Sequence, residues 1–248
     1  MYNYQKKLHR LDQELLLEDI HIQITEVDQI IEKLNNKQVL NHPPKRLGFY
    51  PDELEDLSFS LKLKDIKKLE QANNLLNNFR SFISRNFGLW SLANHQTAKQ
   101  IKAAYQCNTG LELMAGNAYW SKALNEVGVK MVATDSFSWA KSSNTGNRLF
   151  YRTKSYNAVN AIKKFSDVDL IICCWAPNFG NGDNEILQTY RKYCSPSTKL
   201  LFIGEKNGAT NTPAFWQQAH EINSPSLKKV NHNFTNFDFI EEKFYEIK

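Results

Sequence analysis

Residues 109–135, TGLELMAGNAYWSKALNEVGVKMVATD, decide the fold expected for this chain. An apolar run at 111–114 ends in a tight turn, a helix-length segment follows, and a second apolar run at 131–133 stops at Asp135. This pattern is typical of a β-α-β unit whose strands are apolar on both faces, as in a parallel sheet covered by helices. Ligands of such sheets bind beyond the carboxyl ends of the strands. The turn at Gly116 and the side chain of Asp135 are therefore predicted to face the same crevice.

The chain after Asp135 continues this alternation of strands and helices. A polar, turn-rich segment at 136–147 is predicted to be a loop. The last two predicted strands have no helix between them, so they should form an antiparallel hairpin. The seven predicted strands lie near residues 111–114, 131–133, 148–152, 167–174, 200–203, 227–230 and 237–247. The sequence thus predicts an α/β fold with a doubly wound, mostly parallel seven-stranded sheet.

The first 87 residues have a different pattern, which predicts helices. Apolar residues repeat at helical spacing in three stretches, at 8–15, 27–34 and 66–87, with a mixed connector at 47–60. We therefore divide the chain into an N-terminal helical accessory segment, residues 1–87, and a sheet domain, residues 88–248. The helices either pack against a partner or form a lid over the crevice, and the sequence leaves both readings open.

Composition narrows the class of protein. The chain has 248 residues, and 31 Lys and Arg against 26 Asp and Glu give a net charge of +5. No basic run is interleaved with aromatic residues, so nucleic-acid binding has only weak support. The four cysteines lack C-x-x-C spacing and the histidines are dispersed, which favours reduced thiols and no metal site. No segment approaches about 18 uninterrupted apolar residues, so we expect no membrane span and a cytoplasmic protein.

The run LELMAGNAYW at residues 111–120, followed by Asp135, resembles the first motif and the second-strand acid of class I S-adenosylmethionine-dependent methyltransferases. The loop of this family has three glycines. Here only Gly116 is kept, and Met114 and Ala118 stand where the first and third glycines would be. The likeness therefore depends on what accompanies the loop.

Three further segments resemble, in the same order, a bacterial and fungal branch of that family whose loop reads GAGTGYW and whose fourth strand ends in WPP. They are Leu-Trp-Ser at 89–91, Cys-Trp-Ala-Pro at 174–177 and Phe-Ile-Gly-Glu at 202–205. The resemblance covers about residues 88–248. It implies a Rossmann-like methyltransferase fold with S-adenosylmethionine as the cofactor.

The resemblance also implies residues for the amino-acid end of that cofactor. Glu112 and the turn formed by Ala115, Gly116 and Asn117 would line it, because a close backbone with free N–H groups can meet a carboxylate. Trp120, one turn into the following helix, is added to this set, although the reading as a packing residue is favoured.

The remaining cofactor residues implied by the resemblance follow later strands. Asp135 would accept hydrogen bonds from the ribose hydroxyls, although an acid there can also simply cap a turn. Asn157 and Ala158 would border the adenine. Cys174 and Trp175 would lie beneath the methionine and the methyl group that is transferred.

The expected function is methyl transfer to an unidentified acceptor, with a small molecule favoured. The reaction is an in-line displacement that depends on positioning and exclusion of water, with no metal. If a general base is needed, the candidate is Glu205, which is also read as a salt-bridge partner, with Asn178 and Trp175 shaping the pocket. Because the D/N-P-P-Y signature is absent, nitrogen-specific chemistry is not supported.

Two alternatives remain. A non-catalytic cofactor-binding or scaffold protein would keep the sheet while its loop degenerates, as the missing glycines allow. A dinucleotide-dependent oxidoreductase ranks third, because it requires G-x-G-x-x-G after the first strand.

Overall fold

The protein is described by a computed structural model that covers residues 1–59, 61–146 and 148–248. Residues 60 and 147, which end the predicted connector and the predicted loop, lie outside the described residues. The helices that precede the sheet are α1 (Asn3–Leu15), α2 (Glu18–Asn35), α3 (Pro51–Ser58), α4 (Leu63–Asn77) and α5 (Phe79–Phe87). The long helix predicted at 66–87 is thus divided at Asn78.

The sheet has the order β3-β2-β1-β4-β5-β6. Its strands are β1 (Thr109–Leu113), β2 (Lys130–Asp135), β3 (Thr153–Ser155), β4 (Leu170–Cys174), β5 (Lys199–Gly204) and β6 (Lys243–Ile247). Strands β1 to β5 pair in parallel, and β6 pairs antiparallel with β5. The strand order reverses between β1 and β4, where ligands of open α/β sheets bind. The doubly wound, mostly parallel Rossmann-like fold is confirmed.

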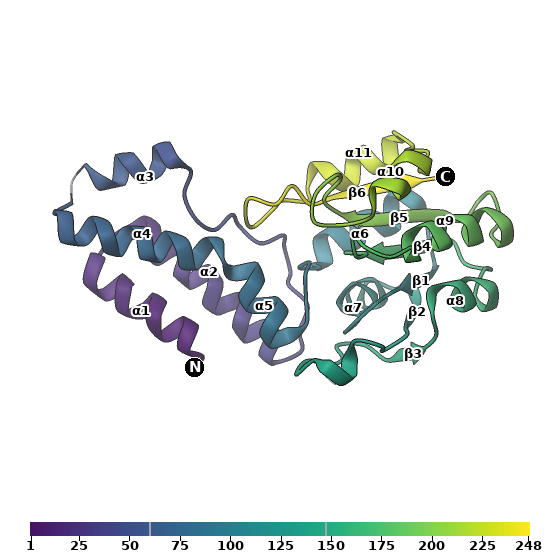
Figure 1. The fold of residues 1–248 in the computed structure, drawn as a ribbon, viewed down its shortest axis with the longest axis horizontal. Helices are drawn as coiled ribbons and strands as arrows, with labels where there is room; N and C mark the ends of the chain where they lie inside the picture. Colours follow the sequence, from purple (N-terminus) through teal and green to yellow (C-terminus); the bar gives the residue numbers. More distant parts are fainter. Residues whose placement is uncertain (60, 147) are drawn as a thin grey trace.

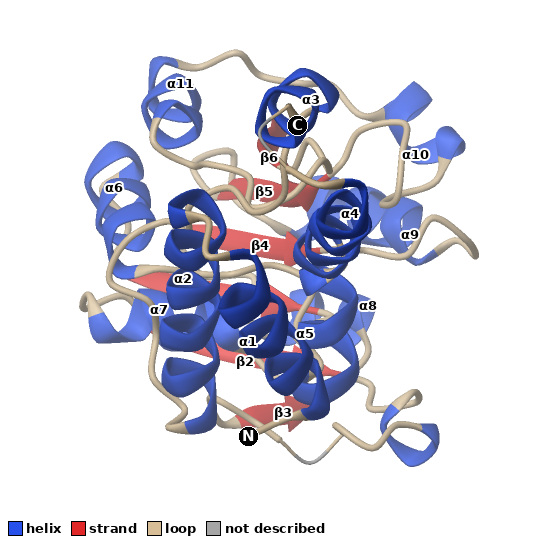
Figure 2. Ribbon diagram, turned by 90° about the vertical axis from the view of Figure 1, so that its left-hand side faces the viewer, coloured by secondary structure: helices blue, strands red, loops and turns tan. Residues whose placement is uncertain are grey.

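Helices cover both faces of this sheet (Figures 1 and 2). One group of neighbouring helices is α6 (His95–Tyr105), α7 (Tyr119–Glu126) and α11 (Pro225–His232). The other is α8 (Ala158–Lys164), α9 (Gly182–Tyr193) and α10 (Pro213–Gln218), and a single 3-10 turn, η1 (Ala140–Ser142), follows β2. Alternate residues of β4 belong to different buried clusters, Leu170 and Ile172 to one, Ile171 and Cys173 to the other. Both faces are therefore buried, as the apolar strands predicted.

The C-terminal prediction is wrong in one part. Residues 227–230, predicted as a strand, lie in α11, so the described sheet has six strands and lacks the hairpin expected at 227–247. The physical reason is a helix start: the Ser224 hydroxyl accepts a hydrogen bond from the Leu227 N–H at 3.0 Å, and Pro225 occupies the first turn. The antiparallel edge strand itself is present as β6. The third strand is short and lies at 153–155 instead of 148–152.

The N-terminal helices stand beside the sheet domain in Figure 1, and Figure 2 shows α1, α2, α4 and α5 in front of the sheet. Among the described residues, they share a core with the sheet domain. One continuous buried cluster runs from Leu8 and Ile83 to Trp120 and Ile203 on one face of the sheet. The predicted boundary at residue 87 therefore falls within one shared core, and the division into two parts stays a prediction. Within the described residues, no helix combines the length and the apolar character that crossing a membrane requires.

Candidate active site

A cavity of about 800 Å³ lies where β1, β2 and β4 end. Its wall includes Glu112, Gly116, Asp135 and Trp175, and α5 adds Ser84 from the N-terminal segment. The volume is within the ~300–1,000 Å³ typical of small-molecule sites. The sequence-predicted crevice is thus present, and the helices before the sheet help to close it.

The loop between β1 and α7 keeps an unusual backbone. Met114, Gly116 and Ala118 all have positive φ, of 51°, 53° and 57°. Glycine adopts this left-handed conformation freely, whereas other residues pay roughly 1–2 kcal/mol each. The loop therefore holds the same conformation at all three positions where the resembled motif has glycine, although two of them carry side chains. Such strain persists only where the surrounding structure imposes it.

Gly116 lies at the centre of this loop, with room on the cavity side. A Cβ built on it would have only the Trp139 ring within 4 Å, at 3.8 Å. Its N–H donates to Asp135 Oδ2 at 2.8 Å, which ties the loop after β1 to the end of β2. A side chain at this position would project into cavity space that is otherwise open to a ligand.

Asp135 is 5% exposed and its carboxylate is already bonded. It accepts hydrogen bonds from Gly116 N at 2.8 Å, Phe137 N at 2.7 Å and Trp139 Nε1 at 3.0 Å. A carboxylate has about four acceptor positions, so one remains, on Oδ2. The residue therefore caps the turn after β2, and it can accept a single ligand hydroxyl unless Trp139 moves away.

Glu112 lies deeper, on β1, and is 2% exposed. Its Oε2 accepts a hydrogen bond from Ser121 N at 2.7 Å, near the start of α7. Burial raises the pKa of this carboxyl to about 7, because the charged form loses its hydration. Near neutral pH the group is therefore divided between its neutral and charged forms, and a cation in the cavity would favour the charged form.

The segment after β3 forms the next part of the wall. Asn157 is the N-cap of α8, and its side chain accepts a hydrogen bond from Asn160 N at 2.8 Å. Asn157 and Ala158 both line the cavity, together with Tyr156, whose N–H donates to the Asp135 carbonyl at 3.0 Å. This segment is thereby fixed to the end of β2.

Cys174 and Trp175 line the cavity at the end of β4. Burial raises the pKa of the Cys174 thiol well above its usual value, so the group stays neutral. Trp175 has a φ of 54°, and its ring stacks on Trp90 with centroids 5.3 Å apart and planes 18° apart. Trp90, which belongs to the Leu-Trp-Ser segment noted in the sequence, lies in the cavity wall.

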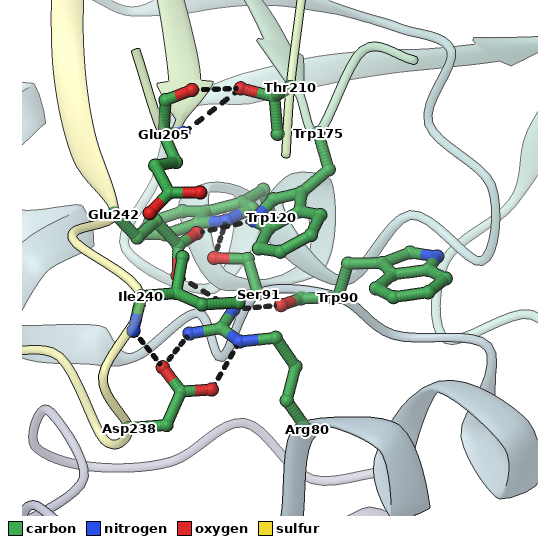
Figure 3. Close-up of polar contacts among 10 residues, drawn as sticks. All are labelled: Arg80, Trp90, Ser91, Trp120, Trp175, Glu205, Thr210, Asp238, Ile240 and Glu242. Atoms are coloured by element: carbon green, nitrogen blue, oxygen red, sulfur yellow. Dashed lines mark hydrogen bonds and ion pairs between the residues drawn. The ribbon is translucent and has the colours of Figure 1, made fainter. Parts of the chain in front are cut away.

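A buried ionic cluster binds the ring nitrogen of Trp175 and the backbone carbonyl of Trp90 (Figure 3). Trp175 Nε1 donates to Glu242 Oε1 at 3.0 Å, and Glu242 Oε2 accepts from Arg80 at 3.0 Å. Arg80 also binds the Asp238 carboxylate through two hydrogen bonds, of 2.6 and 2.9 Å, and donates to the Trp90 carbonyl. Arg80, a residue of α5, therefore fixes the part of the cavity wall that lies at the end of β4.

Two predicted cofactor residues are engaged elsewhere. The Asn117 amide donates to the carbonyls of Phe87, at 2.7 Å, and Thr145, at 3.2 Å, and the residue is not among those lining the cavity. It connects the loop after β1 to the end of α5. Trp120 does line the cavity, but it is 2% exposed and its Nε1 donates to Ser91 Oγ at 3.2 Å. Its ring is mainly part of the core.

The two predicted catalytic residues are not at the cavity wall. Glu205 turns back on its own loop, where Oε2 accepts a hydrogen bond from Ala209 N at 2.9 Å. Asn178 is exposed, and its amide donates to the Gly208 carbonyl at 3.4 Å. Both side chains thus order the loops after β4 and β5. The structure brings neither to the residues predicted to hold the cofactor.

Sequence reasoning missed several residues of the wall, among them Trp139, Tyr156, Phe179 and Glu185. Trp139 could have been noticed as the aromatic residue of a polar loop that follows Asp135. No local signal marks Phe179 or Glu185, because their contribution depends on how the segment after β4 folds over the cavity.

Comparison with known proteins gives structural likeness only. No family model and no curated protein matches the sequence. The chain is similar to human N-acetylserotonin methyltransferase in complex with SAM, with a TM-score of 0.43 and 10% identity over 81% of this chain and 60% of that chain. It is also similar to the mitomycin 7-O-methyltransferase MmcR, with a TM-score of 0.41 and 14% identity over 79% of this chain and 60% of that chain.

The N-methyltransferase NodS from Bradyrhizobium japonicum is a smaller similar protein, with a TM-score of 0.39 and 12% identity over 62% of this chain and 93% of that chain. All three are methyltransferases. The chain spans about three fifths of the length of the first two.

Proposed function

We propose that this chain transfers a methyl group from S-adenosylmethionine to a small-molecule acceptor. The observation that carries this proposal is the loop after β1, which has left-handed backbone at Met114, Gly116 and Ala118. Those are the three glycine positions of the motif that the sequence resembles. In a protein that kept only the sheet and bound no cofactor, nothing would require strained backbone at Met114 and Ala118.

The cavity has a suitable wall for the parts of this cofactor. Glu112 and the open side of Gly116 would meet its amino-acid end, and the remaining acceptor position of Asp135 would take one ribose hydroxyl. Asn157 and Ala158 would border the adenine, with Cys174 and Trp175 beneath the methionine. Asn117 would act from behind the wall by holding the loop, and Trp120, which lines the cavity, would mainly hold the core in place.

When bound, the cofactor supplies a methyl group on a positively charged sulfur. The work left to the chain is to hold an acceptor in line with that methyl and to exclude water. The cavity wall combines residues from several separate segments, including Ser84 of α5 and Trp90 before α6. A nucleophile whose reacting atom carries no proton at working pH needs no base from the protein.

We also propose a cytoplasmic location. All four cysteines are free thiols, two of them buried, and none is paired in a disulfide. Free thiols are typical of reducing compartments.

The test is calorimetric titration of the purified protein with S-adenosylhomocysteine, with NAD in parallel. We expect binding of the first ligand and an increase in melting temperature, because a ligand that binds only the folded state stabilises it. Gly116→Val should lose this binding and fold with a lower melting temperature, since the added side chain enters the cavity and strains a position with positive φ. Absence of binding at millimolar ligand would exclude the proposal, and binding without methyl transfer to any acceptor would leave a cofactor-binding scaffold.

A further inference from the structure

Trp90 presents an aromatic face to the cavity. Its side chain is large and apolar, yet the residue is 51% exposed, and it lines the cavity. One side of the indole stacks on Trp175. An exposed ring that is backed by another ring offers a flat surface of low entropy to a flat ligand.

A buried charged cluster fixes the backbone of Trp90 and the ring of Trp175, on which the Trp90 indole stacks. The cluster behind it contains Arg80, Asp238 and Glu242, which are 4%, 7% and 2% exposed. It bonds both to the Trp90 carbonyl and, through Glu242, to the Trp175 ring nitrogen (Figure 3). Burying three charged groups is rarely worth its desolvation cost for stability alone. A second benefit is that the Trp175 ring and the Trp90 backbone are fixed before a ligand arrives, which lowers the cost of binding.

The charges of the cavity wall are of one sign. Its ionisable acids are Glu112, Asp135 and Glu185, and among residues whose side chains the structure describes, the wall contains no Lys, Arg or His. A phosphate or carboxylate on an acceptor would therefore find no cation of the described protein wall to pair with. Anionic ligands are normally held by such cations.

We propose that Trp90 is the stacking platform for the methyl acceptor, and that the acceptor is a flat, unsaturated ring system without negative charge. This deepens the proposed function and rests on it, because Trp175, against which Trp90 stacks, is placed at the methyl end of the cofactor. Trp90 contacts the acceptor and not the cofactor. The charged cluster acts through Trp175 and is a positioning device.

The experiment measures binding of three matched probes by calorimetry, with the protein saturated with S-adenosylhomocysteine. The probes are 2-naphthol, which is flat and neutral, 2-naphthoate, which is flat and anionic, and decahydro-2-naphthol, which is neutral and puckered. We expect 2-naphthol to bind about tenfold or more tightly than either other probe, given the size of aromatic stacking effects. Trp90→Leu should weaken 2-naphthol by about tenfold, and Trp90→Phe by less.

The control is Tyr193→Leu, which removes another exposed ring, on α9 and outside the cavity wall. It should leave all three affinities unchanged, and melting temperatures should show that every variant folds. Equal binding of 2-naphthoate would overturn the charge argument, and equal binding of decahydro-2-naphthol would overturn stacking. If Trp90→Leu weakens S-adenosylhomocysteine as much as 2-naphthol, the platform belongs to the cofactor. Failure of the parent protein to bind S-adenosylhomocysteine would instead remove the proposed function itself.

Discussion

The two walls of the cavity are built in opposite ways. On the β1–β2 side, the hydrogen bonds of Asp135 reach residues 19, 2 and 4 positions away in the sequence. On the β4 side, Arg80 reaches Asp238 and Glu242 across 158 and 162 positions. The first wall is a local motif that folds with its own β-α-β unit. The second exists only when the N-terminal helices, the end of β4 and the C-terminal segment have come together.

The largest effect on stability should follow from a substitution of Arg80, which holds the β4 side of the cavity wall. Arg80→Met leaves Asp238 and Glu242 buried without their cation, which typically costs about 3–5 kcal/mol of stability. Urea unfolding monitored by circular dichroism measures this loss. Arg10→Met is the control, because it removes an exposed i,i+4 partner of Glu14 and should cost less than about 0.5 kcal/mol. Equal costs for the two variants would mean that the cluster is not structural.

Glu112, on the β1–β2 side of the cavity, should make the stability of the protein depend on pH. Its folded-state pKa of about 7 lies above the ordinary 4.5, so the folded protein holds a proton that the unfolded chain releases. The protonated Glu112 carboxyl therefore favours the folded state. This contribution to the free energy of unfolding is complete below pH 4.5 and is lost as pH rises through 7, by up to about 3 kcal/mol.

The matching variant is Glu112→Gln, which keeps an oxygen for Ser121 N and does not titrate. The stability of the parent relative to this variant should fall between pH 5 and pH 8, measured by urea unfolding at both values. A constant difference would contradict the raised pKa.

Asp135 should show a mixed effect, since it is both a cap and a proposed ribose acceptor. Asp135→Ala removes three hydrogen bonds and should lower the melting temperature. It should also weaken S-adenosylhomocysteine by at least about tenfold, since a hydrogen bond to a charged acceptor contributes ~1.5–3 kcal/mol. Asp135→Asn keeps one acceptor oxygen and should lose less of both. A lower melting temperature with unchanged affinity, measured by calorimetry, would leave Asp135 as a cap only.

The smallest effect is expected at Ala118. Ala118→Gly relieves the left-handed strain but removes a buried methyl group and loosens the unfolded chain, so its stability should stay within about 1 kcal/mol of the parent. Its affinity for S-adenosylhomocysteine should not change. Loss of binding in this variant would show that the methyl group, and not the backbone conformation, is what the loop conserves for its ligand.

The sequence by itself determined the parallel sheet, the helices that alternate with its strands and the wall around Gly116 and Asp135. These features rest on periodicity and on turns, which are properties of neighbouring residues. The same local reasoning was wrong at 227–230, where Leu and Val three positions apart suit either a strand or a helix and a serine cap decides for the helix.

Tertiary structure alone decided the β4 side of the cavity wall and the place of the N-terminal helices. No spacing in the sequence connects Arg80 with Glu242 or turns Trp90 toward Trp175, because these contacts depend on the shared core that fixes α5 against the end of β4. It also turned Glu205 away from the cavity, since its carboxylate is bonded to the backbone of its own loop. Which polar groups remain free for a ligand is settled only after the folded chain has satisfied its own hydrogen bonds.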